Sequence, residues 1–130
     1  MKFLKSIAVL LGLTTLPSCN DTPEQSSNHE HAVIVVFDYG STNLQPMFDL
    51  EEKLERAISN AQVGEYDGNE IAIDGSDGSL YMYGPDADRL FAVIKPILQS
   101  TPFMHGAKVK LRYGPPEDDV PENIVTIEHK

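Results

Sequence analysis

Two hydrophobic periods alternate along this chain between residues 32 and 127, and their order limits the folds that it can adopt. Residues 32–37 form a continuous, mostly β-branched run, which is typical of a central strand buried on both faces. Apolar side chains then recur every three or four positions from Pro46 onward, which predicts an amphipathic helix that begins near this proline. The stripe consists of Met47, Leu50, Leu54, Ala57, Ile58 and Ala61.

The second half of the chain repeats this alternation. Residues 69–74 and 79–83 predict two short strands joined through Gly75-Ser76-Asp77-Gly78 as a β-hairpin. A second helix is expected to open at Pro85 or Asp86, with Pro96 kinking it or ending it early. Residues 108–113 alternate as a half-buried strand, and residues 124–127 predict a last strand at an edge.

This order of elements predicts an α+β fold. A β-α-β-β-α-β chain with one added C-terminal strand is the ferredoxin-like split βαβ arrangement, an antiparallel sheet with two helices on one face. Counted along the chain, the expected strand order is 5-4-1-3-2. The length of 130 residues suits one such domain and hardly allows two.

A weak internal echo suggests which side chains face the helices. Phe37-Asp38-Tyr39-Gly40 and Tyr81-Met82-Tyr83-Gly84 share the pattern aromatic-x-Tyr-Gly, and each closes a strand before a helix. If these aromatic residues face the helices, alternation along the strands predicts an apolar patch bordered by three cations on the open face. That candidate binding face consists of Ile34, Val36, Leu80, Met82, Lys108, Lys110 and Arg112.

The N-terminus carries a targeting signal. Lys2 and Lys5 precede the apolar run 7–13, which is too short to cross a bilayer and fits the core of a signal peptide. Leu16-Pro17-Ser18-Cys19 resembles the lipobox of bacterial lipoproteins. The resemblance implies cleavage before Cys19 and lipidation of its thiol, with palmitate among the acyl chains, and places the protein in the bacterial cell envelope on a periplasmic or outer surface. An ordinary secretory signal, with Cys19 near its cleavage site by chance, is the alternative.

These observations divide the chain into three parts. Residues 1–18 are the expected lipoprotein signal peptide, and residues 19–30 are the lipidated cysteine and a polar tether that cannot bury surface. Residues 31–130 form the expected single domain. Because Lys2 and Lys5 leave with the signal, the remaining eight basic and twenty acidic residues give a net charge of −12. Such a chain does not suit nucleic acid, and its body is repelled by anionic headgroups, so the lipid alone is expected to hold it to the membrane.

The residues offer little for catalysis. The chain has no Gly-x-Ser-x-Gly elbow, its one cysteine is assigned to the lipid, and three of its four histidines lie in the tether or near the chain ends. The turns around Asp67-Gly68 and Asp74-Gly75 lack the spacing of calcium loops, so neither a metal nor a cofactor is expected. The remaining polar and aromatic candidates for contacts are Asp38, Tyr83, Asp86 and Tyr113. Asp86 and Asp88 are better explained as a helix cap and a first-turn charge, and Tyr83 and Tyr113 are expected as neighbours.

A second resemblance covers nearly all of the domain. Its strand ends, residues 37–42, 81–88 and 111–116, resemble those of a group of uncharacterised small bacterial α+β proteins, which supply no catalytic motif to transfer. The preferred hypothesis is therefore a membrane-tethered, non-catalytic module that binds a protein partner. One alternative is an acidic immunity or inhibitor protein for a basic toxin or enzyme. Another is a cell-envelope hydrolase that uses Asp38 or the pair Asp86 and Asp88.

Overall fold

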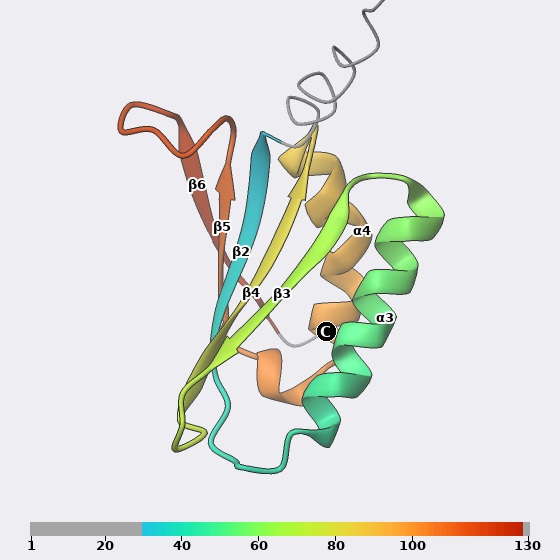
Figure 1. The fold of residues 1–130 in the computed structure, drawn as a ribbon, viewed down its shortest axis with the longest axis vertical. Coiled ribbons are helices and arrows are strands. Elements are labelled where there is room, and N and C mark those ends of the chain that lie inside the picture. The colour runs from blue at the N-terminus through green and yellow to red at the C-terminus, as the bar shows by residue number, and fades with distance from the viewer. Residues whose placement is uncertain (1–29, 129–130) are drawn as a thin grey trace, which may run out of the picture.

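The computed structural model describes residues 30–128, which form a five-stranded antiparallel sheet with two helices on one face (Figure 1). The strands are β2 (His31–Asp38), β3 (Glu65–Ile71), β4 (Asp77–Gly84), β5 (Lys108–Arg112) and β6 (Glu122–Thr126). The helices are α3 (Gln45–Ala61) and α4 (Ala87–Gln99), with a short 3₁₀ turn η3 (Pro102–Met104). The strand order β3-β4-β2-β5-β6 is the order expected from the sequence, which confirms the α+β class and the ferredoxin-like arrangement.

Both helices pack through the apolar stripes that the sequence indicates. The stripe of α3 buries Met47, Leu50, Leu54 and Ile58. On α4, Asp86 is the N-cap, and its side chain accepts hydrogen bonds from the backbone N–H groups of Asp88 and Arg89, as expected. The helix does not end early at Pro96 but continues to Gln99.

The β3–β4 hairpin differs from the expected one in its bounds. β3 begins at Glu65 rather than 69 and ends at Ile71, and Gly78 lies inside β4 rather than in the turn. A bulge between Tyr66 and Gly68 shifts the register of β3 against β4, so the sequence Asp67-Gly68-Asn69 is part of a strand. Bulges of this kind add one unpaired residue at a sheet edge, which is where β3 lies.

The facing of β4 corrects the sequence analysis. Leu80 and Met82 are fully buried beneath the helices, whereas Tyr81 and Tyr83 point to the opposite face and are partly exposed. The repeated aromatic-x-Tyr-Gly pattern gives the wrong facing because Phe37 is paired with Gly78 and Ile34 with Tyr81. Odd-numbered residues of β2 therefore share a face with even-numbered residues of β4. Burying the thioether and the leucine leaves the two tyrosine hydroxyls near water.

β2 and β5 face as predicted. Val33, Val35 and Phe37 on β2 and Val109 and Leu111 on β5 are buried against the helices, and Ile34 and Val36 lie on the opposite face. Lys108, Lys110 and Arg112 are on that face too. Within residues 30–128, no helix is long and apolar enough to cross a membrane. Cys19 and the signal and tether predictions lie outside the described residues.

Candidate functional site: the outer face of the sheet

The candidate site is the side of the sheet away from the helices, called here the outer face. Both helices lie on the opposite side of the sheet, as Figure 1 shows. Strand pairing places its residues in three rows that cross all five strands from β3 to β6.

The rows follow the order β3, β4, β2, β5 and β6. The first row, nearest the start of β2, consists of Glu65, Tyr83, Ala32, Arg112 and Glu122. The middle row consists of Gly68, Tyr81, Ile34, Lys110 and Ile124. The last row consists of Glu70, Ser79, Val36, Lys108 and Thr126. Beyond the last row, Asp38 pairs with Asp77 at the end of β2.

The outer face is apolar along its centre. Val36 on β2 is 49% exposed and Ile124 on β6 is 55% exposed, and both are among the most exposed large hydrophobic side chains of the described chain. Ile34, Tyr81 and Tyr83 lie beside them and are partly exposed. The apolar surface runs over β4 and β2, and Lys110 on β5 separates it from Ile124. Exposed apolar surface rimmed by polar residues is typical of a contact surface.

Charge on the outer face is divided between its two sides. The β3–β4 side carries the carboxylates of Glu65, Glu70 and Asp77, and the β5–β6 side carries the three cations and Glu122. The cations are only loosely held. Lys108 Nζ donates to Thr126 Oγ1 at 3.0 Å, and Lys110 Nζ lies 3.9 Å from Glu122 Oε1. Arg112 is tied more firmly, because its Nε donates to the Gly114 carbonyl at 2.8 Å.

On the β3–β4 side, Tyr81 donates its hydroxyl to Glu70 Oε1 at 2.8 Å. This hydrogen bond to the carboxylate is the main reason why the pKa of Tyr81 lies above its ordinary value. Tyr81 is partly exposed on the outer face. Tyr81 and Ile124 belong to the site, although the sequence analysis did not select them. The pattern Gly78-Leu80-Met82-Gly84, with its two glycines and two apolar residues on one side of β4, is a signal that Tyr81 faces the other side.

The predicted polar contacts do not form one site. Asp38 ends β2, whereas Asp86 caps α4 beside the start of β2, about seven residues or 23 Å away along the strand. Tyr83 is on the outer face, and Tyr113 lies on the helix side, where its hydroxyl donates to Asp88 Oδ1 at 2.7 Å. Tyr83 and Tyr113 are therefore not neighbours on one face. Asp38 lies apart from Asp86 and Asp88, which are together at the start of α4.

Tyr113 and Asp86 instead belong to a structural cluster at the start of α4. His31 Nδ1 accepts the backbone N–H of Ala87 at 3.0 Å, and its ring meets the ring of Tyr113 edge-on at 5.9 Å. The hydrogen bond to Asp88 raises the pKa of the Tyr113 hydroxyl. Each of these contacts satisfies or orients the first turn of the helix, which is the function of a cap.

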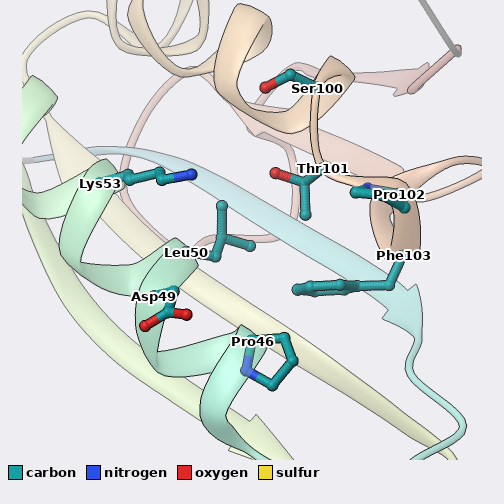
Figure 2. A pocket seen from close by; sticks show the side chains of 8 residues that line it. All are labelled: Pro46, Asp49, Leu50, Lys53, Ser100, Thr101, Pro102 and Phe103. Carbon is teal, nitrogen blue, oxygen red and sulfur yellow. The ribbon is translucent and has the colours of Figure 1, made fainter.

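A hollow lies between α3 and η3, on the helix side of the molecule (Figure 2). Its volume is about 350 Å³, and its walls are Leu50, Phe103 and two prolines, Pro46 and Pro102. Figure 2 shows the Lys53 ammonium directed across it toward Thr101, with Asp49 on the same helix. The hydroxyls of Ser100 and Thr101 both donate to the Ile97 carbonyl, so their oxygens can only accept further bonds. The rim of the hollow therefore carries one positive group, Lys53, and several hydrogen-bond acceptors. This combination does not favour either an anionic or a cationic ligand.

Comparison of the chain with the models of protein families, with curated proteins and with solved structures finds no match. Among residues 30–128, no three His, Cys, Asp or Glu side chains lie together in an arrangement that could hold a metal ion. The function is therefore inferred from the outer face and from the N-terminal sequence.

Proposed function

We propose that this chain is a lipid-anchored protein of the bacterial cell envelope whose domain binds another protein through the outer face. The observation that carries this proposal is the position of Val36, half exposed on the central strand β2, on the face of the sheet opposite the helices. Side chains exposed singly are ordinary, but here Ile34 and Tyr81 extend the apolar surface of Val36 over two neighbouring strands. Ile124 adds a further exposed apolar side chain beyond Lys110.

The composition of the face suits a protein partner. Tyrosine and arginine are the residue types that most often dominate protein interfaces, and the outer face has two tyrosines and one arginine around an aliphatic centre. The anchor rests on the lipobox at 16–19 and on the tether that follows it.

Lysine footprinting tests the binding surface. Membranes that contain the full chain are treated briefly with an acetylating reagent, and the acetylation rate of each lysine is compared with that in the purified chain. We expect Lys108 and Lys110 to react several-fold more slowly in the membranes, because a partner covers them. Lys53 and Lys95, exposed on the helices, serve as matched controls and should react at unchanged rates. Equal rates at all four lysines in both samples would contradict the proposal.

The anchor is tested separately. Cells that express the full chain are grown with radiolabelled palmitate, and the label should appear in the wild-type chain and be absent from Cys19→Ser. Label that persists in Cys19→Ser, or none in either chain, would contradict the anchor and leave the binding surface unaffected.

The alternative of an acidic inhibitor draws on a different surface. Glu51 and Glu55 on α3 lie next to the acidic strand β3, and Tyr66 Oη on β3 donates to Glu51 Oε2 at 2.9 Å. This acidic edge would suit a basic partner, whose association must weaken steeply as salt is raised. A complex that survives high salt would favour the outer face instead.

A further inference from the structure

We infer that the protein that covers the outer face is a second copy of this chain, related by a twofold axis that runs close to the direction of β2. This inference rests on the proposed function, since it names the partner of the same surface. It follows from the order of residues in the three rows.

A twofold axis along β2 turns one sheet over onto another and exchanges the two sides of the face. The central strand then lies against its own copy, with Ile34 facing Ile34 and Val36 facing Val36. The β4 column of one chain faces the β5 column of the other. Tyr83 therefore faces Arg112, Tyr81 faces Lys110, and Ser79 faces Lys108.

The same operation matches the outer strands. Gly68, which has no side chain, faces the exposed Ile124, and Glu70 faces Thr126 one strand away from Lys108. Cations held over tyrosine rings and beside a carboxylate are attracted to both, and these contacts recur twice in a symmetric pair. The face is thus complementary to itself in charge and in shape along this axis.

The other twofold axis that would stack the two sheets with their strands aligned runs across the strands, and it gives the opposite result. It places each column on its own copy, so Lys108, Lys110 and Arg112 meet the same three cations. The carboxylates of Glu65 and Glu70 likewise meet each other. Like charges opposed across an interface oppose association, so charge selects the axis along β2.

The proposed anchor selects the same axis. β2 begins at His31, directly after the tether, so an axis along β2 brings the tethers of both copies to one end of the pair. An axis across the strands would place the two starts at opposite ends, about 26 Å apart for an eight-residue strand. Two chains anchored in one membrane meet most easily with both starts toward that membrane.

Two like-charge contacts remain, and both are at the rim. Asp38 approaches its own copy, and Glu65 approaches Glu122 at a corner of the face. Stacked sheets are rotated by roughly 30°, which separates corners and strand ends while the middle row stays in contact. Water also screens charges at an exposed rim.

The size of the face predicts a weak pair. Five strands spaced about 4.8 Å and five residues long at about 3.4 Å give a footprint of roughly 24 by 17 Å, or about 400 Å². This is about half of the 800 Å² that each partner contributes to a standard interface. Confinement to one membrane raises the effective concentration of the two copies and offsets the small area.

Photo-crosslinking in the native membrane tests the inference. Two full chains with different tags are expressed together, each with benzoylphenylalanine in place of Val36. Phe48, 50% exposed on α3, provides a matched control position on the opposite side of the molecule. We expect a covalent product that contains both tags from position 36 and none from position 48.

The outcomes separate this inference from the proposed function. A product at position 36 that contains only another protein would overturn the second copy and support the binding surface. No product of any kind at position 36 would overturn both. The axis is tested by the same residue in place of Tyr81, whose adduct should map to β5 of the other copy, because an axis across the strands would direct it to β4.

Charge reversal on β5 tests the contacts quantitatively, through the yield of the two-tag product. Lys108→Glu with Lys110→Glu should reduce the two-tag product about tenfold, the change expected when contacts worth about 1.4 kcal/mol are lost. Lys53→Glu with Lys95→Glu makes the same change of net charge on the helix side and should leave the yield unchanged. Equal loss in both double variants would show that net charge alone is responsible and would overturn the paired arrangement.

Discussion

Phe37 on β2 and Gly78 on β4 are register partners, and the phenyl ring occupies the space that a side chain at position 78 would need. A Cβ added to Gly78 would lie 2.9 Å from Phe37 Cζ and 2.5 Å from Ile71 Cδ1. The ring also packs against Phe103 at 5.8 Å and Tyr39 at 6.3 Å. This contact fixes which face of β4 turns inward, and with it the identity of the residues on the outer face.

Gly78→Ala is therefore expected to destabilise the domain by about 1–3 kcal/mol, the range for overpacking a filled core. Urea unfolding followed by circular dichroism measures the change. The double variant with Phe37→Leu should lose less than the sum of the two single variants, because the smaller residue removes the contact with Phe37 Cζ. The contacts with Ile71 Cδ1 and the Glu70 carbonyl oxygen remain. Strict additivity would contradict the contact.

The facing of β4 predicts unequal costs for neighbouring truncations. Leu80→Ala should lower the free energy of unfolding by about 2–5 kcal/mol, since the side chain is fully buried. Val36→Ala should cost less than about 1 kcal/mol, because half of that side chain is already exposed. Similar costs at the two positions, measured by urea unfolding, would show that the assignment of faces is wrong.

Asp86→Ala should destabilise the domain by about 1 kcal/mol, because the backbone N–H groups of Asp88 and Arg89 would lose their acceptor. Asp86→Ser keeps an oxygen at the cap and should retain most of the stability. Thermal unfolding measures the loss of stability in Asp86→Ala and in Asp86→Ser. A loss of equal size in both would mean that the charge of Asp86, rather than its capping geometry, is the stabilising feature.

The environment of Tyr66 predicts that the free energy of unfolding falls at alkaline pH. Burial, and then the hydrogen bond to Glu51, raise its pKa far above the ordinary 10.0. The fold therefore favours the neutral phenol. This contribution is complete below pH 10.0 and is lost as the pH rises above it, because the unfolded chain then ionises first. Unfolding free energies measured from neutral pH to pH 11 should fall less in Tyr66→Phe than in the wild type. Parallel curves would contradict this role.

The sequence predicted the order of the elements better than their contacts. Periods of two and of three to four residues reveal strands and helices directly, and the connections of a β-α-β-β-α-β chain leave few topologies. The predicted facing of β4 is wrong because the repeated aromatic-x-Tyr-Gly pattern does not indicate which side of the strand is buried. The alternating Gly78, Leu80, Met82 and Gly84 do indicate it. Which side of a strand is buried depends on its register with the neighbouring strands. The register is a property of residue pairs and cannot be read from the sequence of one strand alone.

The hollow between α3 and η3 was beyond sequence reasoning for a related reason. Lys53 and Phe103 are fifty residues apart and meet only because η3 folds back beside α3. By contrast, the three cations of the outer face were found correctly. The strict alternation from Lys108 to Arg112 admits only one facing when Val109 and Leu111 are apolar.

The self-association of the outer face is tested most directly by a charge exchange between two tagged full chains in one membrane. One chain carries Lys108→Glu and Lys110→Glu, and the other carries Glu70→Lys. Zero-length coupling of amines to carboxylates is followed by recovery under denaturing conditions. The twofold axis along β2 predicts that the mixed pair is coupled between position 70 of one chain and position 108 or 110 of the other, while each variant fails to couple to itself. Equal coupling of either variant to itself and to the other would contradict the account.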